Sequence, residues 1–489
     1  MELNISFIGY IVLSLISKIK QDEGTNIVSY HPIRFRGIKD RLKLYFFSVS
    51  KIDNGLLRPF KIHRSMGVVN FIQPKRLHRY KINSNALLQK IEKRDKEYLI
   101  NLEVEGIRIG DLFYDWYLRS HLAETLDLNE KDFKRDFLFF CKNFYWWLDY
   151  FHENKVDSVF VSHTVYQFAL PARVGLKFGA KVFLAAGNRI YQITSGKLWS
   201  DIEFLSYVPG INNQFGYEVD LSRAKLELNK LRQGSRIIAA HAYGSGYSGA
   251  NTSKIIKEPQ SINILIACHC FSDAPHAYGD MLFPDFGEWL NFIGELSKNL
   301  TYTFYAKPHP HFWDSDKILY RKFLNKFPNI IGIPSDVSNT TLFNQGINVV
   351  LTVNGTIAFE AAYEGILVIN GSLNSPHVNY PFTLTPASTI ELQNYFFNLE
   401  NILKFWSPKK SDIEHFFDIH HLRKNTNFLF GKNTPLFYQY IGGYKEQFTN
   451  PKVLEYWMNE VKKSDIELVK NRIKNFLRSD QYFLDNWFS

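Results

Sequence analysis

The sequence predicts an α/β protein made of two successive domains with parallel sheets, followed by C-terminal helices. Short β-branched runs alternate with helical patterns in both halves, which favours crossover units over hairpins. We expect one such βαβ unit at 156–184 and a second at 347–371, and a Gly/Ser-rich stretch at 243–260 separates the two halves. Sheets built from these units are Rossmann-like and bind ligands at the carboxyl ends of their strands.

The length and composition agree with a folded protein of more than one domain. At 489 residues the chain is too long for one ordinary core. Its apolar content of 45% and its charged content of 22% exclude a disordered chain. We expect an N-terminal domain, a linker, a second domain and a C-terminal helical segment, at 1–242, 243–260, 261–400 and 401–489.

The net charge of +10, from 58 basic and 48 acidic residues, limits the partners. An anionic membrane surface or a phosphate-bearing substrate explains this charge. Nucleic acid is not expected, because no helix-turn-helix, zinc-finger or RNP pattern accompanies the charge. No segment reaches 18 apolar residues, so the sequence predicts no membrane-spanning helix.

The three cysteines are too few for a disulfide framework and indicate a reducing cytoplasm. Cys268 and Cys270 flank His269, and His276 follows, which resembles a metal-binding pattern. The sequence has no second cysteine pair with the spacing of a zinc site, so we expect no metal.

The N-terminal half begins with an apolar stretch at 5–19 that lacks the basic residues and the cleavage site of a signal peptide. We expect a strand, a turn at Gly9 and a helix there. The basic stretch at 32–100 is expected to be irregular, either as a solvated loop or as a membrane-facing patch. Further expected elements are a strand at 26–30, a helix at 131–155, and a strand, a helix and a strand at 156–161, 166–179 and 181–184.

Three polar residues of this half stand out. His163 directly follows the strand at 156–161, where ligands of α/β sheets gather. A histidine at such a place is equally often a hydrogen-bonded turn residue, so both interpretations stay open. Asp111 and Asp115 are four residues apart among the aromatic residues of IRIGDLFYDWYLR at 107–119.

The second half repeats the alternation of strands and helices. Expected strands lie at 262–267, 301–306, 329–333, 349–353 and 366–369, and expected helices at 286–300, 357–364, 451–462 and 464–478.

The turn between the strand at 349–353 and the helix at 357–364 is a candidate phosphate site. Asn354, Gly355 and Thr356 form this turn, and a helix that begins there directs free backbone N–H groups at one point. Glu360, one turn into the helix, could accept hydrogen bonds from a ribose hydroxyl pair. A plain crossover with a solvated glutamate explains the same pattern, and this alternative stays open.

Three segments of the second half follow strands of one expected sheet. They are 272–276 (SDAPH), 307–310 (KPHP), and the turn 354–356 with its helix. The carboxyl ends of parallel strands meet at one edge, so these segments are expected to converge there. Two histidines, a lysine, two carboxylates and a helix N-terminus at one edge favour an active site.

Two Rossmann-like halves, a linker and a helical C-terminal segment resemble the GT-B glycosyltransferases. These enzymes bind a nucleotide-sugar in a cleft between two such domains with their sheets facing it. Sugar transfer needs charge on the leaving phosphate, for which Lys307, His309 and the amides of 355–356 are suited. Asp273 is then the candidate nucleophile or base. His276 and His163 are further acid/base candidates.

The His-Pro pair at 309–310, followed by a Gly-Thr turn with Phe-Glu on its helix, resembles the capsule-polysaccharide transferases that use CMP-activated ulosonic acids. This resemblance covers chiefly 260–375, and it implies that His309 and Pro310 contact the CMP phosphate and that Glu360 lies by the ribose. It also implies that Asp273 matches the catalytic aspartate of a retaining subset. We identify no counterpart of that group's acid/base glutamate, which leaves retention or inversion open.

The resemblance implies a cytoplasmic glycosyltransferase of bacterial capsule or surface-polysaccharide biosynthesis, in peripheral contact with the inner membrane. It would transfer a Kdo- or pseudaminic-acid-like sugar from a CMP donor to an oligosaccharide or lipid-linked glycan, without a metal or other cofactor. A UDP-hexose donor is the main alternative. A UDP-sugar epimerase and a non-catalytic polysaccharide-binding protein are further alternatives.

Overall fold

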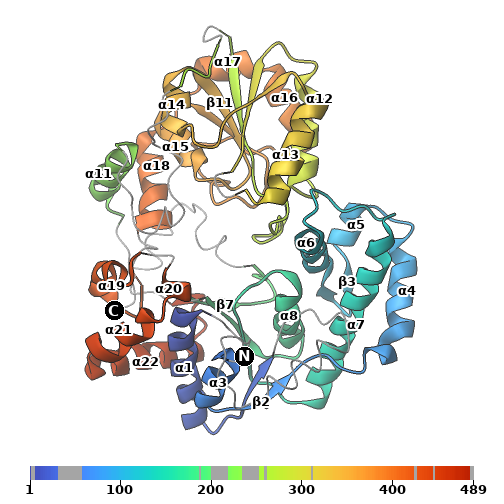
Figure 1. Cartoon of the computed structure of the whole chain (residues 1–489), viewed down its shortest axis with the longest axis vertical. Helices are drawn as coiled ribbons and strands as arrows, with labels where there is room; N and C mark the ends of the chain where they lie inside the picture. Colours follow the sequence, from blue (N-terminus) through green and yellow to red (C-terminus); the bar gives the residue numbers. More distant parts are fainter. Residues whose placement is uncertain are drawn as a thin grey trace. The chain divides into compact units, whose positions relative to one another are not determined.

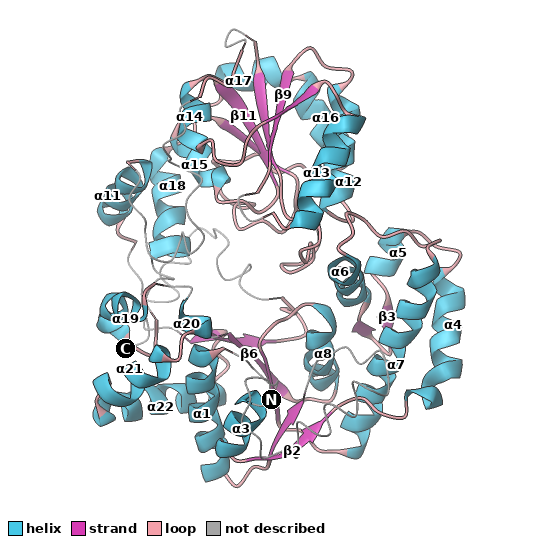
Figure 2. Cartoon of the chain, in the orientation of Figure 1, coloured by secondary structure: helices cyan, strands magenta, loops and turns pink. Residues whose placement is uncertain are grey.

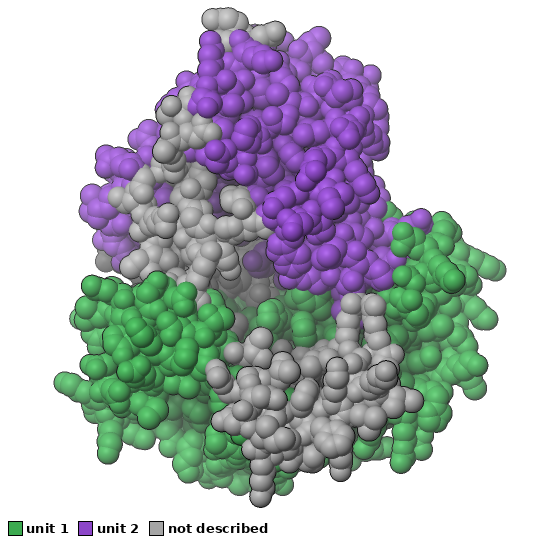
Figure 3. All heavy atoms as spheres, in the orientation of Figure 1, with its two compact units in different colours: residues 1–113, 129–200, 426–489 green, residues 114–128, 201–425 purple. Residues whose placement is uncertain are grey.

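The structure is a computed structural model that describes residues 1, 6–30, 58–186, 189–199, 219–233, 253–257, 261–309, 312–422, 427–443 and 446–484. The chain divides into two compact units, which Figure 3 shows in different colours. Unit 1 comprises Met1–Phe113, Asn129–Ser200 and Thr426–Ser489, and unit 2 comprises Tyr114–Leu128 and Asp201–Asn425. The expected helical segment at 401–489 is therefore divided between the units. Most of the expected linker lies outside the described residues.

Unit 2 contains a five-stranded parallel sheet in the order β10-β9-β8-β11-β12 (Figure 2). β8, the first strand of unit 2 along the chain, lies in the middle of this sheet, and the order on its two sides is that of a doubly wound Rossmann sheet. The predicted α/β class with a Rossmann-like parallel sheet is confirmed. The strands are β8 (Asn263–Ala267), β9 (Thr303–Lys307), β10 (Ile330–Gly332), β11 (Ile347–Thr352) and β12 (Leu367–Asn370).

Alternate residues of these strands pack into two separate cores, one on each face of the sheet. Ile264 and Phe304 pack against α12, α13 and α16, whereas Leu265 and Tyr305 pack against α14, α15 and α18. Figure 1 shows these two sets of helices on opposite sides of β11. Their bounds are α12 (Phe286–Ser297), α13 (Asp314–Lys326), α14 (Asn339–Asn344), α15 (Ile357–Tyr363), α16 (Thr389–Phe397) and α18 (Lys410–Phe417); the unit also holds α11 (Leu221–Arg232), α17 (Leu399–Phe405) and a π-helix at Asp418–Leu422.

Unit 1 contains a mixed sheet in the order β13-β7-β6-β5. β5 and β6 are parallel and are joined by a 3₁₀ turn (Tyr166–Ala169) and α8, which confirms the predicted crossover. β7 pairs antiparallel with β6, and β13 pairs antiparallel with β7, so this sheet is not purely parallel. The bounds are β5 (Ser158–Val161), α8 (Leu170–Lys177), β6 (Lys181–Ala186), β7 (Arg189–Ile193) and β13 (Phe483–Leu484).

The prediction of a strand and a glycine turn near the N-terminus is wrong for the residues from Phe7 onward. α1 (Phe7–Asp22) is one continuous helix, and Ser6 caps it by accepting the N–H of Gly9. Gly9 therefore lies in the first turn, where a cap stabilises the helix start despite the glycine. The apolar side chains of α1 pack with α21 (Lys452–Glu460) and α22 (Lys463–Arg478), which agree with the two predicted terminal helices.

The expectation of an irregular stretch at 32–100 is wrong for 58–100. This part holds short helices and a strand, and β2 pairs parallel with the predicted strand β1. Residues 31–57 lie outside the described residues. Within the described residues, no helix has the length and apolar character needed to span a bilayer. The remaining elements of unit 1 are β1 (Ile27–Tyr30), α3 (Arg58–Ser65), β2 (Val68–Ile72), a 3₁₀ turn (Leu77–Tyr80), α4 (Lys81–Ile91), α5 (Lys96–Ile100), β3 (Glu103–Val104), β4 (Ile107–Arg108), α7 (Lys131–Glu153), a 3₁₀ turn (Gly431–Asn433), α19 (Thr434–Ile441) and α20 (Glu446–Thr449); α6 (Gly110–His121) has residues in both units.

Candidate functional site

The loops that follow β8 and β9 meet at the carboxyl edge of the unit 2 sheet, as the sequence predicts. Cys270 Sγ lies 3.6 Å from His309 Nδ1, and the ring centroids of His269 and His309 are 5.9 Å apart. His309 is half-buried. Pro310 lies outside the described residues, so its expected contact with a nucleotide stays a prediction.

A buried chain of polar groups joins the ends of β9, β10 and β11. The Lys307 ammonium donates to Asn339 Oδ1 at 2.5 Å, and the Asn339 amide donates to Glu360 Oε2 at 2.6 Å. The Thr356 hydroxyl donates to the other carboxylate oxygen of Glu360 at 3.1 Å. Lys307 is 5% exposed and Glu360 is 1% exposed. The amide of Asn339 thus bridges a buried cation and a buried carboxylate.

Burial shifts the pKa values of both charged groups in this chain. Desolvation lowers the pKa of Lys307 to about 8, although the charges of Glu360 and Asp336 raise it. Desolvation also raises the pKa of Glu360, against the hydrogen bonds from Asn339 and Thr356 and the charge of Lys307. Each group therefore favours the charged state of the other in a site that disfavours charge.

The placement of Lys307 and Glu360 bears on their expected roles. Both carboxylate oxygens of Glu360 accept hydrogen bonds from the protein, and the side chain is almost fully buried, so contact with a ribose requires the neighbouring side chains to move. The Lys307 ammonium likewise points to Asn339 and not to solvent. Their roles at a nucleotide stay predictions. Asn339 is a residue that the sequence does not reveal, because nothing in its surroundings resembles a motif.

The turn 354–356 needs glycine at its centre. A Cβ atom on Gly355 would lie 2.8 Å from Thr352 Oγ1, and this oxygen accepts the Gly355 N–H at 3.2 Å. Asn354 Oδ1 is buried without a hydrogen-bond partner among the described residues, and Thr356 is exposed. The turn thus combines a buried amide oxygen with an exposed residue whose hydroxyl donates to Glu360.

Asp273 and His276 lie in the loop after β8 but differ in exposure. Asp273 is exposed, and its Oδ1 accepts the N–H of Ala274 at 3.0 Å. His276 is 2% exposed, and its Nδ1 lies 2.6 Å from Asp115 Oδ1. Asp115 Oδ2 also accepts the backbone N–H of His276 at 3.3 Å. Asp273 is therefore open to a substrate, whereas His276 is held against α6.

His163 belongs to unit 1. It follows β5 and is exposed, and its Nδ1 lies 2.7 Å from Ser162 Oγ. Asp111, the other aspartate of the aromatic segment, forms a buried bidentate pair with Arg173 in the same unit. The acid/base role of His163 stays a prediction.

In the Cys-His-Cys segment Cys268 is buried and Cys270 is half-buried. Burial raises the pKa of Cys268 and of Cys270 to about 12, so both thiols stay protonated near neutral pH. Burial also lowers the pKa of His269. Among the described residues, no group of three or more His, Cys, Asp or Glu side chains is arranged to hold a metal ion.

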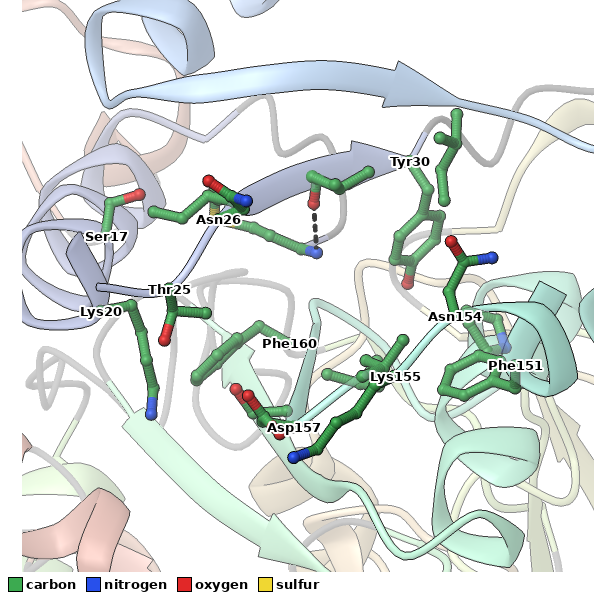
Figure 4. Close-up of a pocket in the computed structure, with 18 of the residues that line it drawn as sticks. Ser17, Lys20, Thr25, Asn26, Tyr30, Phe151, Asn154, Lys155, Asp157 and Phe160 are labelled. Carbon is green, nitrogen blue, oxygen red and sulfur yellow. Dashed lines mark hydrogen bonds between the residues drawn. The ribbon is translucent and has the colours of Figure 1, made fainter. Parts of the chain in front are cut away.

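Unit 1 holds a separate cavity of about 580 Å³ between the C-terminal ends of α1 and α7, beside the strands β1 and β5. Figure 4 shows polar side chains from both helix ends around it, among them Ser17, Asn26, Asn154 and Asp157. It contains none of the site residues that the sequence predicts.

Comparisons with known proteins give similarity to solved structures only. No protein-family model matches the chain, and no curated protein matches it. Similar structures include KpsC of Thermosulfurimonas dismutans, a beta Kdo 2,4 transferase, with 11% identity and a TM-score of 0.32 over 53% of this chain and 77% of that chain. They also include a UDP-GlcNAc 2-epimerase from Neisseria meningitidis, with 14% identity and a TM-score of 0.29 over 64% of this chain and 89% of that chain. Both TM-scores are below 0.5.

Proposed function

We propose that the chain is a glycosyltransferase that binds a nucleotide-activated sugar at the carboxyl edge of the unit 2 sheet. The observation that carries this proposal is the buried chain from Lys307 through Asn339 to Glu360 beneath that edge. Burying two charged groups costs free energy, and perturbed pKa values cluster at functional sites. The buried charged groups lie next to a Gly-Thr turn, and the backbone N–H groups of such a turn suit a phosphate ligand.

The groups at this edge have different chemical roles. His309 and the turn 354–356 hold the phosphate of the nucleotide, and the charge of Lys307 stabilises it from below. When the bond between the sugar and the phosphate breaks, its electron pair goes to the phosphate oxygen, and an acceptor hydroxyl forms the new bond to the anomeric carbon. Asp273 either takes the proton of that hydroxyl or first forms a covalent bond to the sugar, with inversion or retention respectively.

The donor that we propose is a CMP-activated ulosonic acid of the Kdo or pseudaminic acid type. The acceptor is a glycan or lipid-linked glycan of a bacterial surface polysaccharide, reached from the cytoplasm at the inner membrane. A UDP-hexose donor would use the same phosphate ligands, so the nucleotide decides between the two.

The first test is a thermal-shift series with CMP, CDP, UDP, GDP and ADP, because a ligand of the folded state raises the apparent melting temperature. A rise with CMP alone supports the ulosonic acid donor, and release of CMP from CMP-Kdo with an acceptor glycan would then establish transfer. A rise with UDP alone shifts the donor to a hexose. No rise with any nucleotide, together with no binding by calorimetry at millimolar concentration, contradicts the proposed function.

A further inference from the structure

A half-buried arginine lies close to the same edge of unit 2 and is not explained by the fold. Arg119 is in the last turn of α6, and its guanidinium carbon lies 3.8 Å from the ring centroid of Trp313. Trp313 follows the loop after β9 and is 42% exposed. The charge of Arg119 also acts on the thiol of Cys270, whose pKa it lowers against the effect of burial. Because Cys270 contacts His309, these four side chains belong to one patch.

The guanidinium of Arg119 differs from the other arginines of the described chain that stand beside carboxylates. Arg173 pairs with Asp111, Arg232 with Glu364 and Arg478 with Glu23. No such ion pair is found for Arg119 among the described residues, and its guanidinium lies over the face of Trp313. Its planar set of N–H donors matches the geometry of an oxyanion, and a position over the face of an aromatic ring leaves those donors available in the plane of the guanidinium.

If a nucleotide-activated sugar binds at the carboxyl edge of the unit 2 sheet, its negative charge requires a cation at the surface of that edge. The expected positive charge, Lys307, is buried and donates to Asn339, and α15 behind the turn 354–356 has only 7 residues. Neither feature supplies a full positive charge at the surface. Arg119, whose charge acts on the Cys270 thiol that lies against His309, supplies such a charge.

The segment Tyr114–Leu128 that carries Arg119 is fixed to unit 2 by buried polar contacts. Asp115 bonds to His276 at 2.6 Å, and the Tyr114 hydroxyl and the Thr125 hydroxyl donate to Asp285 at 2.5 Å and 2.6 Å. A ligand group held on such a segment loses little conformational entropy when it binds an anion.

We propose that Arg119, positioned by Trp313, binds the oxyanion of the activated sugar donor. The shared chemistry is that of a phosphate or a carboxylate, so the group is either the nucleotide phosphate or the carboxylate of the sugar. This inference rests on the proposed function and adds to it the residue that recognises the charge of the donor. Arg119 contacts the substrate, whereas Trp313 acts through Arg119.

The test measures binding by calorimetry to the full chain, with CMP, UMP, their nucleosides cytidine and uridine, and free Kdo as probes. We expect Arg119→Ala to weaken the nucleotide that the wild type binds by about 10- to 100-fold, the loss typical of a hydrogen-bonded charge, and to leave the matching nucleoside unchanged. Arg119→Lys keeps the charge but not the planar donors, so its affinity should fall between the two. Higher salt should weaken the wild type more than Arg119→Ala.

A matched control is Arg94, an exposed arginine of unit 1 whose guanidinium carbon lies 4.9 Å from the Tyr98 ring centroid. Arg94→Ala should bind every probe as the wild type does. Unchanged nucleotide affinity with weaker binding of Kdo would assign the sugar carboxylate to Arg119. Wild-type affinity of Arg119→Ala for all probes would overturn the inference but keep the proposed function. If the wild type itself binds no probe, both fail. Melting curves that match the wild type show that the variants are folded.

Discussion

At the scale of single residues, the site combines the exposed carboxylate of Asp273 with the buried ammonium of Lys307. One is open to solvent at the edge of the sheet, and the other lies beneath it with a shifted pKa. The two groups therefore need different experiments. The role of Asp273 is tested by the rate of sugar transfer, and that of Lys307 by the pH dependence of the free energy of unfolding.

Substituting Asp273 should affect turnover and not nucleotide binding. Asp273→Asn removes the base or nucleophile while keeping the shape, so we expect the rate of sugar transfer to fall by about 10²- to 10⁴-fold. Nucleotide affinity should stay within about twofold, since the group does not carry the phosphate charge. Asp280→Asn, an exposed carboxylate of the same loop, is the control. Transfer at the wild-type rate by Asp273→Asn would make Asp273 a structural residue.

Lys307 should make stability depend on pH above neutrality. Its pKa is about 8 in the folded state and 10.5 as the ordinary value, so between these values the unfolded state binds more protons. The free energy of unfolding of the wild type, relative to that of Lys307→Met, should therefore rise with pH from about 8 to about 10.5. The slope should reach at most about 1.4 kcal/mol per pH unit. Denaturant titrations at several pH values measure it.

The charge of Glu360 provides the control for this pH dependence. Because Glu360 raises the pKa of Lys307, Glu360→Gln should move the start of the rise to lower pH. A difference between wild type and Lys307→Met that is flat across this range would contradict the shifted pKa.

At the scale of elements, the strand-turn-helix from β11 to α15 is the part that the sequence predicts most closely. Its β-branched run, Gly-Thr turn and following helical pattern are all local signals. α1 is mispredicted because the cap at Ser6 tolerates the glycine that suggested a turn. Asn339 and Arg119 could not be found from the sequence, since their partners lie far along the chain and only the tertiary fold brings them together.

The turn should not accept a side chain at its glycine. In Gly355→Ala the new Cβ would lie 2.8 Å from Thr352 Oγ1, so the buried Thr352 side chain or the turn has to shift. We expect a loss of about 1–3 kcal/mol in the free energy of unfolding and weaker nucleotide binding. Chemical denaturation and calorimetry measure the two effects. Gly196→Ala is the control, because nothing lies within 4 Å of its Cβ position, and equal behaviour of the two variants would refute the packing argument.

At the scale of the whole molecule, unit 1 depends on chain segments from both ends of the sequence. α1 packs with α21 and α22, and β13 pairs with β7. Unit 2, in contrast, takes all five strands from Asn263 to Asn370. The sequence does not predict this division, since composition and periodicity carry no signal for which distant segment closes a sheet.

A core substitution in α22 should therefore act on unit 1 alone. Ile473 is fully buried, and Ile473→Ala should destabilise unit 1 by about 2–5 kcal/mol. Hydrogen exchange should show faster exchange in α1 and β7, with β8 to β12 unchanged and nucleotide affinity retained. Leu468→Ala, at a side chain that is 51% exposed on the same helix, should leave exchange unchanged. Equal acceleration in the strands of unit 2 would contradict independent cores.

The pairing of β13 with β7 also sets an order of events during synthesis. The five strands of unit 2 have all been translated once Asn370 has left the ribosome, so that sheet can form while the chain is still growing. Unit 1 has to wait until α22 and β13 emerge, more than a hundred residues later. Throughout that interval α1 can pack against β6 but lacks its contacts with α21 and α22, so part of its apolar face stays uncovered. We expect this exposed face to make the nascent chain a substrate for chaperones, and the last helix to influence the yield of folded protein.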